Sequence, residues 1–294
     1  VVTTFALTSA ATTANGKADY QLTFDQLVYD LDPFDFKTSG TAVGCQVGTP
    51  TGNGYTFQVS VTNCSSGTLN LSLRPAAVIG ASAGPATETL AQGEVTIDGN
   101  PPAFTINAPA SPSSATSPTF VVSSIEPFIK PVTSAFQVDG SGCSLGTINM
   151  LTASSAEVHL LGCQHAANVR LTLLANGIYD LAGNAGPGVN LISADVLIDR
   201  EAPMVTSNHQ ISATADLIEF EINFNETVTG LKIDSFGVSP GCVPSKLEGE
   251  GSHYVLWVSG CQDAASVTLK PNSVFDTAGN RLQTTCTDIA VSAL

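Results

Sequence analysis

Apolar and polar residues alternate along several short stretches of the chain. Between residues 55 and 62, Tyr55, Phe57, Val59 and Val61 alternate with polar residues without a break, which is the pattern of a strand with one buried face. β-branched and aromatic residues fill such stretches, and Gly, Pro, Asn and Ser separate them. No stretch of helical length shows a 3.6-residue period. The pattern predicts an all-β protein built from short strands.

Six of the seven cysteines recur as three pairs at one period. The first members are 98 and 99 residues apart, the second members are 99 and 98 apart, and the separations within a pair are 19, 20 and 19. The pairs are Cys45 with Cys64, Cys143 with Cys163, and Cys242 with Cys261. A common period indicates tandem repeats, and about seven short strands in ~98 residues suit an immunoglobulin-like (Ig-like) two-sheet sandwich. We therefore expect three tandem Ig-like domains, at 1–100, 101–201 and 202–294.

Short linkers join the expected domains. Residues 99–102 contain two prolines, and residues 200–203 contain one. Such connections are stiffer than flexible Gly/Ser tethers. The sequence therefore predicts a semi-rigid, extended array of the three domains.

Three motifs resemble the bacterial-type Ig-like repeats of large surface proteins. They are the Asp-x-x-Gly-Asn loops at 180–184 and 276–280, the Val-x-Ile-Asp ends at 95–98 and 196–199 before each linker, and the Phe-Asn-Glu-Thr-Val-Thr stretch at 224–229. In that family such domains form stalks of adhesins and other cell-surface proteins, sometimes with calcium at the joints. Similar repeats occur in algal and protist surface proteins, including gamete adhesins. This chain departs from the family in its cysteine pairs, and in its first unit, where Gly-Ala-Ser-Ala-Gly at 80–84 replaces the Asp-x-x-Gly-Asn loop.

The three cysteine pairs predict one disulfide in each domain. Each bond closes a loop of about 20 residues, worth about 3 kcal/mol in the chain-entropy model. A zinc site is the alternative, but one Cys pair per domain without a nearby His fits zinc badly. Disulfides imply an oxidising compartment and hence an extracellular or cell-surface location. Cys286 has no counterpart in the first two units, and a buried thiol, a partner outside this segment or an intermolecular bond all remain open.

Charge composition limits the partners. The chain has 25 acidic and 10 basic residues, a net charge of −15. Such a chain repels phosphate backbones and anionic membranes, which argues against nucleic-acid binding. No apolar run reaches the ~18–20 residues that cross a bilayer, so we expect no direct membrane insertion by this segment.

Acidic and amide side chains at the expected joints are calcium candidates. They are Asp98, Asp180, Asn184, Asp199, Asp276 and Asn280. Calcium takes 6–8 oxygen ligands and would stiffen a joint. The simpler interpretation is that these Asp and Asn residues bind their own backbones in turns, because no dense ligand loop is present. The sequence predicts no other cofactor.

Surface modification and partner contact have their own candidates. Asn63, Asn70 and Asn225 begin Asn-x-Ser/Thr sequons and are glycosylation candidates in a secreted protein. Trp257 is the only tryptophan and lies on the outward phase of its strand. An exposed Trp is a frequent anchor for a partner, and a neighbouring loop or domain can equally cover it.

Catalytic signals are weak. The Gly-x-Ser-x-Gly at 80–84 matches a nucleophile elbow, but that motif needs a parallel strand, a helix and triad partners. The four histidines (His159, His165, His209 and His253) are scattered, and none stands beside a plausible nucleophile, so surface positions are the default interpretation. We expect no enzyme.

The expected function is that of a non-enzymatic, extracellular stalk or adhesion segment, an assignment that follows mostly from the family resemblance. One alternative is a cell–cell recognition module, as in gamete adhesion, that binds a protein on another cell. Another is self-association as the subunit of an extracellular filament, with edge strands paired between molecules.

Overall fold

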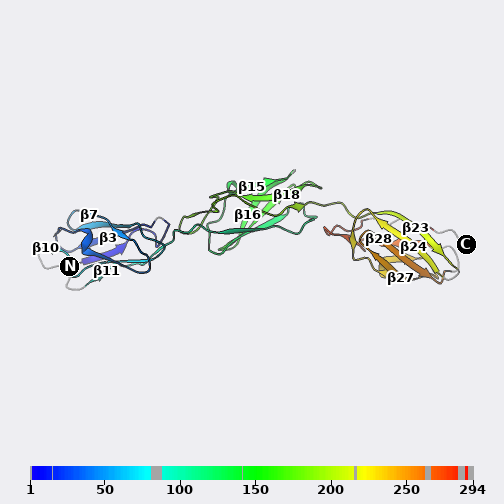
Figure 1. Ribbon diagram of the computed structural model, residues 1–294, viewed down its shortest axis with the longest axis horizontal. Coiled ribbons are helices and arrows are strands. Elements are labelled where there is room, and N and C mark those ends of the chain that lie inside the picture. The colour runs from blue at the N-terminus through cyan, green and yellow to red at the C-terminus, as the bar shows by residue number, and fades with distance from the viewer. Residues whose placement is uncertain are drawn as a thin grey trace.

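The computed structural model describes residues 2–14, 16–80, 88–140, 142–214, 217–261, 266–283 and 289–290. They form short β-strands joined by turns, with a short 3-10 helix ahead of one strand in each third of the chain. Figure 1 shows three β-rich bodies placed one after another along the long axis of the molecule. We call them the first, second and third sandwich.

The second sandwich shows the topology most plainly. One sheet has the strand order β13-β14-β17-β16, and the other has the order β15-β18-β21, with β22 also paired to β18. All of these pairings are antiparallel. Lettered A to G along the chain, the strands stand in the sheet orders A-B-E-D and C-F-G of a constant-type Ig domain. Its elements are β13 (Phe104–Asn107), β14 (Thr119–Ser124), η2 (Thr133–Ala135), β15 (Phe136–Asp139), β16 (Ser144–Thr152), β17 (Ser155–Leu161), β18 (Asn168–Leu173), β19 (Ile178–Tyr179), β20 (Ala185–Gly186), β21 (Leu191–Ile192) and β22 (Val196–Leu197).

The third sandwich repeats this order, with sheets β23-β24-β28-β27 and β26-β29-β31. A two-stranded ribbon of β25 and β30 pairs Val228 with Asp276 and corresponds to the bridge between Phe128 and Asp180 in the second sandwich. Its elements are β23 (Val205–Ala213), β24 (Leu217–Phe224), β25 (Val228–Thr229), η3 (Ile233–Ser235), β26 (Phe236–Val238), β27 (Val243–Glu250), β28 (His253–Ser259), β29 (Ser266–Leu269), β30 (Phe275–Asp276) and β31 (Ile289–Ala290).

The first sandwich has the same plan with a broken edge. Its sheets are β1-β3-β8, edged by the two short strands β6 and β7, and β11-β9-β12-β2, with β5 paired to β9. Pro50 lies between β6 and β7, and proline cannot donate to a β-ladder. Its elements are β1 (Val2–Leu7), β2 (Thr12–Thr13), β3 (Ala18–Phe24), β4 (Val28–Tyr29), η1 (Pro33–Asp35), β5 (Phe36–Ser39), β6 (Gln46–Val47), β7 (Thr51–Gly52), β8 (Thr56–Thr62), β9 (Gly67–Leu73), β10 (Ile79–Gly80), β11 (Thr89–Leu90) and β12 (Val95–Ile97).

Alternating burial explains why these segments form sandwiches. Along β3, Tyr20, Leu22 and Phe24 point into the core and the residues between them do not, as a period of two requires. The buried hydrophobic residues of the described chain form three clusters, one in each sandwich. Tyr20, Phe120 and Phe220 hold equivalent positions at their centres, each with 0% of its surface exposed. The predicted all-β, Ig-like fold is confirmed.

Three disulfides clip together the ends of strands D and E. They join Cys45 to Cys64, Cys143 to Cys163, and Cys242 to Cys261. The residue before each of these cysteines has a positive φ: Gly44, Asn63, Gly142, Gly162, Gly241 and Gly260. Glycine and asparagine adopt this left-handed backbone most easily, which explains the repeated Gly-Cys. Cys286 lies outside the described residues.

Candidate functional site

The buried Asp180 organises the Asp-x-x-Gly-Asn loop of the second sandwich. Its Oδ1 accepts hydrogen bonds from Gly183 N at 2.6 Å and Asn184 N at 2.8 Å, and its Oδ2 accepts one from Asn184 Nδ2 at 2.8 Å. Gly183 has φ +100, a conformation that favours glycine at this place. Three N–H donors offset the cost of burying the carboxylate, which is only 2% exposed.

The same asparagine reaches across to the preceding sandwich. Asn184 Nδ2 donates a second hydrogen bond, of 2.8 Å, to the backbone carbonyl of Asp98. Asp98 directly follows β12, a strand of the first sandwich. One amide group therefore ties the loop of one sandwich to the end of the one before it. We call this contact, with its surrounding carboxylates, the first joint.

The second joint repeats this arrangement with Asp276 and Asn280. Asn280 N and Nδ2 donate to Asp276 Oδ1 and Oδ2 at 2.8 and 2.7 Å. Asn280 Nδ2 also donates to the backbone carbonyl of Asp199 at 2.9 Å. Asp276 is 2% exposed, as Asp180 is. The recurrence shows that the contact is built into the repeat.

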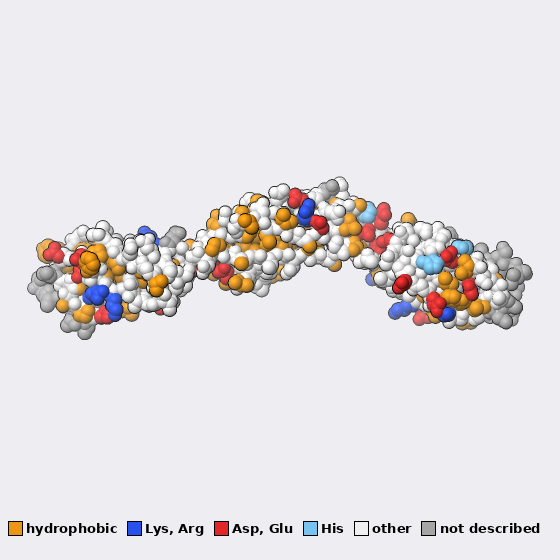
Figure 2. Space-filling view, viewed as in Figure 1, with side chains coloured by type: hydrophobic (Ala, Val, Ile, Leu, Met, Phe, Trp, Pro, Cys, Tyr) orange, Lys and Arg blue, Asp and Glu red, His pale blue; other side chains and the backbone are white. Residues whose placement is uncertain are grey.

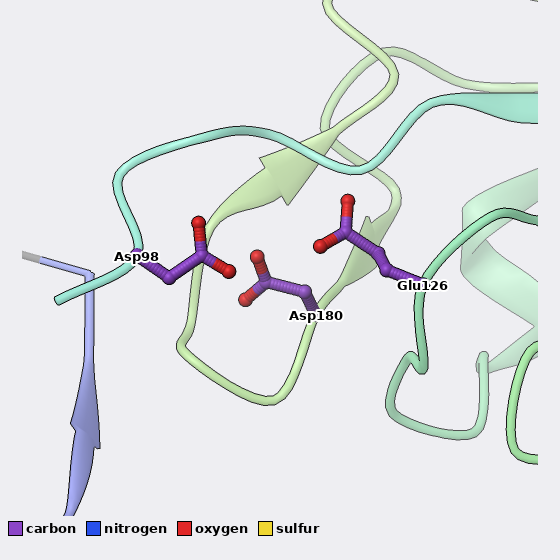
Figure 3. A group of neighbouring side chains, drawn as sticks. All are labelled: Asp98, Glu126 and Asp180. Atoms are coloured by element: carbon purple, nitrogen blue, oxygen red, sulfur yellow. The ribbon is translucent and has the colours of Figure 1, made fainter. Parts of the chain in front are cut away.

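A glutamate completes an acidic cluster at each joint. Asp98, Glu126 and Asp180 each place a carboxylate oxygen within 4.8 Å of the other two, and Figure 3 shows the three carboxylates turned toward one another. Burial raises the pKa of Glu126, and the charges of Asp98 and Asp180 raise it further.

The cluster at the second joint consists of Asp199, Glu226 and Asp276. Burial again raises the pKa of the glutamate, followed in order by the charges of Asp276, Asp199 and Glu201. Glu226 therefore meets three neighbouring carboxylates, whereas Glu126 meets two.

Both clusters have the chemistry of a hard-cation site. They offer only carboxylate oxygens, which suit calcium and not zinc. Both oxygens of Asp180 are already engaged by N–H donors, so the outer carboxylates of Asp98 and Glu126 would provide most of the binding. Three carboxylates are fewer than the 6–8 oxygens that calcium takes, so water or backbone carbonyls would supply the rest.

The structure brings together the calcium candidates that the sequence singles out, in two groups: Asp98, Asp180 and Asn184, and Asp199, Asp276 and Asn280. The amide groups of Asn184 and Asn280 face the carboxylates as donors. Sequence reasoning missed Glu126 and Glu226. Their repetition was the available signal, since Glu126 and Glu226 stand 100 residues apart just after strand B.

The two joints differ in the side chain that accepts a hydrogen bond from the linker backbone. At the first, Gly99 N donates to Ser66 Oγ at 3.0 Å, and at the second, Arg200 N donates to His165 Nδ1 at 3.1 Å. His165 Nδ1 also lies 3.6 Å from Asp199 Oδ1. A cavity of about 280 Å³ beside this histidine is lined by His165, Ala166, Leu197, Ile198, Asp199, Glu201, Asn225 and Glu226. In Figure 2, red carboxylates gather beside a histidine between the second and third sandwich.

The side chains of all three sequon asparagines make hydrogen bonds within the protein. Asn63 Nδ2 donates to Gln46 Oε1 at 2.9 Å, and Asn70 Nδ2 donates to Glu94 Oε2 at 3.0 Å. Asn225 Oδ1 accepts from Met204 N at 2.7 Å. Glycosylation at these positions stays a prediction. Residues 81–84 of the Gly-x-Ser-x-Gly stretch lie outside the described residues.

Trp257 is partly exposed on β28. It stands opposite Glu219 on one neighbouring strand and Lys246 on the other. Lys246 Nζ lies 4.7 Å from the centre of its ring, a cation–π contact. A partner that used the indole face would first displace this lysine, so Trp257 as a contact residue stays a prediction.

The described residues include no helix of the length and apolarity that crossing a membrane requires. No protein-family model matches the chain, and no curated protein matches its sequence. Among solved structures, the chain is similar to invasin, a bacterial integrin-binding protein, with 13% identity and a TM-score of 0.37 over 98% of this chain and 59% of that one. It is similar to InvD of Yersinia pseudotuberculosis, with 11% identity and a TM-score of 0.39 over 99% and 98% of the two chains.

A marsupial T cell receptor also matches, with 11% identity and a TM-score of 0.23 over 99% of this chain and 98% of that one. At such identities a likeness concerns the fold alone. The Ig-like assignment therefore rests on the strand order described above, and membership of the bacterial-type repeat family stays a prediction.

Proposed function

We propose that this chain is a non-enzymatic segment of an extracellular surface protein, in which three domains (1–100, 101–201 and 202–294) form a stalk that holds a binding surface away from the cell. The observation that carries the proposal is the twice-repeated joint. Neighbouring domains move relative to one another by default unless their contact restrains them. A side-chain amide bonded to the preceding sandwich supplies such a restraint at the same place in the second and third sandwiches.

The disulfides and the charge support an extracellular setting. Three disulfides per chain are stable in an oxidising compartment and rare in a reducing one. A net charge of −15 favours solubility and opposes binding to nucleic acid or anionic lipid. A protein partner therefore suits this surface better than a polyanion.

Calcium at the joints remains a prediction that the stalk does not require. The asparagine contacts are hydrogen bonds between protein groups, while a divalent cation would cancel the repulsion among the three carboxylates of each cluster. Adding calcium to the chelated protein tests this directly, with particle length and thermal stability as readouts.

Small-angle X-ray scattering of the full chain tests the stalk. The expected result is a monomeric, elongated particle with a narrow spread of shapes, and a broader, shorter distribution for the Asn184→Ala/Asn280→Ala double variant. Asn149→Ala is the matched control, because Asn149 is exposed on β16 away from both joints. Equal scattering from the wild type and the double variant would contradict the proposed role of the joints.

Two other outcomes would replace the stalk with a rival function. Saturable binding of the isolated segment to cells or to a purified protein, lost on Trp257→Ala, supports a recognition module. Assembly above a threshold concentration, followed by light scattering, supports a filament subunit.

A further inference from the structure

One strand of the second sandwich, β16 (Ser144–Thr152), has an outer edge that is open. It is the last strand of the sheet β13-β14-β17-β16, and among the described residues it pairs with β17 alone. An edge strand exposes a row of backbone N–H and C=O groups, which is a template for pairing with another strand. Proteins therefore either protect such an edge or use it for binding.

The equivalent edge strands of the other two sandwiches are protected. In the first sandwich, Pro50 lies between the two-residue strands β6 and β7. In the third, β27 carries Pro244, Lys246, Glu248 and Glu250. Proline and charged side chains are common means of preventing an edge from pairing. β16 reads Ser-Leu-Gly-Thr-Ile-Asn-Met-Leu-Thr and contains neither, so the repeat does not require an unprotected edge at this place.

A cavity of about 400 Å³ lies beside this edge. Residues 146–149 of β16 line one side of it, and residues 130–133 line the other. The second stretch leads through η2 into β15, which is the edge strand of the other sheet. The cavity therefore lies between the open edges of the two sheets, where an added strand would run.

The pairing of β16 with β17 is irregular next to the cavity. The register shifts between Leu145 and Ile148, so Gly146 and Thr147 stand opposite a single residue of β17, which is the count of a β-bulge. A register shift occurs at the same place in β27. The bulge thus belongs to the repeat, and the absence of proline and charge is what distinguishes β16.

The surroundings of the cavity are apolar, with one positive charge. Val132 beside it and Leu151 on β16 are 64% and 51% exposed, and Figure 2 shows hydrophobic side chains gathered over the part of the second sandwich where Figure 1 labels β16. Lys130 is the only charged residue among the described residues that line the cavity. An apolar segment with one carboxylate therefore matches this surface.

A second copy of the chain matches it less well. Its own β16 contains no acidic residue and would bring no carboxylate to Lys130. Two chains that each carry a net charge of −15 also repel one another. The charges therefore favour a segment of a different protein.

We propose that the edge of β16 and the cavity beside it bind an extended segment of a partner protein, which adds a strand to the sheet. Backbone hydrogen bonds along β16 supply affinity, and alternate apolar side chains of the segment enter the cavity. A carboxylate of the segment pairs with Lys130. This binding surface goes beyond the proposed stalk, which the scattering experiment tests separately.

A phage-displayed library of random nine-residue peptides, selected against the full chain, tests the site. The enriched peptides should alternate β-branched or aromatic residues with polar ones and contain Asp or Glu. A synthetic peptide of the enriched sequence should bind with a micromolar Kd. It should also slow amide hydrogen exchange within residues 144–152, which a contact through side chains alone would not do.

Two variants and a control locate the bound peptide. Thr147 precedes Ile148 as Lys246 precedes Leu247, so Thr147→Lys puts in a residue that the third sandwich holds at the same place. It should weaken peptide binding at least ~10-fold, as should Lys130→Glu. Thr105→Lys is the matched control, because Thr105 is exposed on β13 at the opposite edge of the same sheet, and it should leave the affinity unaltered.

Three results would overturn the proposal. They are the enrichment of no peptide, equal affinity of the enriched peptide for the wild type and Thr147→Lys, and a dimer in analytical ultracentrifugation that Thr147→Lys dissociates. The second would place the peptide elsewhere on the chain, and the third would make the occupant a second copy. Thermal unfolding checks that each variant is folded, and if Thr147→Lys is not, the same comparison is made with Lys130→Glu, which changes a residue outside the strands.

Discussion

The first sandwich and its two successors differ at the loop that makes the joints. All three share the strand order, a central aromatic residue and a disulfide at the same place. Only the second and third have the Asp-x-x-Gly-Asn loop, and there Asn184 and Asn280 bind a carbonyl of the sandwich before them. The sequence of the first has Gly-Ala-Ser-Ala-Gly instead. The sandwich therefore does not need this loop, whose particular task is to attach one repeat to the preceding one.

Removing a feature common to all three sandwiches should lower the free energy of unfolding of each by the same amount. Cys143→Ser/Cys163→Ser opens a loop closed over 20 residues, and the other two disulfides close loops over 19. The chain-entropy model gives a loss of about 3 kcal/mol in the free energy of unfolding for each. Chemical denaturation of the three double variants, followed by fluorescence and circular dichroism, measures it. A sandwich that lost nothing would differ from its neighbours in a way the shared geometry does not explain.

The loop should matter only where a preceding sandwich is bound. Asn184→Ala removes two hydrogen bonds, to Asp98 O and to Asp180 Oδ2, and leaves the buried carboxylate with its two backbone donors. We expect the second sandwich to lose about 2 kcal/mol of unfolding free energy, and Asn280→Ala to do the same to the third.

Amide hydrogen exchange locates that loss. Faster exchange should appear at residues 180–184 and at the end of the first sandwich, because the bond joins both. Acceleration confined to the loop would mean that the bond to the preceding sandwich contributes nothing.

At one core position a substitution should raise stability where the preceding ones lower it. Tyr20 occupies the place of Phe120 and Phe220, and its hydroxyl has no hydrogen-bond partner among the described residues although it is fully buried. Burial raises the pKa of Tyr20 to about 12, so the phenol stays neutral throughout the physiological range. Tyr20→Phe removes an unsatisfied polar group and should stabilise the first sandwich by about 1 kcal/mol.

The reciprocal change is the control for that prediction. Phe120→Tyr introduces a hydroxyl into an equivalent apolar site and should destabilise the second sandwich by about 1–3 kcal/mol. Thermal unfolding of both variants measures the expected gain and the expected loss of stability. A loss of stability in Tyr20→Phe would show that the hydroxyl has a partner, such as a buried water.

Short-range patterns carried most of the fold. Alternation in stretches such as 55–62 predicts strands, and the cysteine period predicts three copies, because both depend on local geometry and on repetition. The type of residue at Gly44 is typical of a turn, whereas its positive φ is seen only in the structure. Pairing order, in contrast, is set by contacts between residues far apart in the sequence, so it had to come from the structure.

The sites were predicted only in part, for a physical reason. Asp180 and Asn184 lie in one short motif that marks a turn, and repetition marked Asp98 and Asp199 as ends of repeats. Glu126 joins them from a separate loop, and nothing in its neighbours in sequence reveals that contact. The cavity beside β16 is lined by residues 130–133 and 146–149, and only the fold brings these two stretches together. Short motifs thus reveal turn chemistry, while clusters assembled across strands stay hidden.

The smallest expected effect is the change in pH-dependent stability on replacing the glutamate of either joint. Burial first, and then neighbouring carboxylates, raise the pKa of Glu126 and Glu226 above the ordinary 4.5. Between the ordinary pKa of the unfolded chain and the raised pKa of the folded protein, the folded protein therefore binds more protons. This contribution to stability rises as the pH falls through that window and is least favourable at neutral pH.

Glu126→Gln and Glu226→Gln should each stabilise the protein at pH 7, by less than about 1 kcal/mol because both side chains are partly solvated. Each should also flatten the rise in stability toward pH 4.5. Glu226→Gln should have the larger effect, since three carboxylates raise the pKa of Glu226 and two raise that of Glu126, although a hydrogen bond from Asn225 offsets part of the difference. Thermal unfolding between pH 4.5 and 7.5 at low salt measures the dependence of stability on pH for the wild type and both variants. A wild type that lost stability on mild acidification would contradict repulsion among the carboxylates of the clusters.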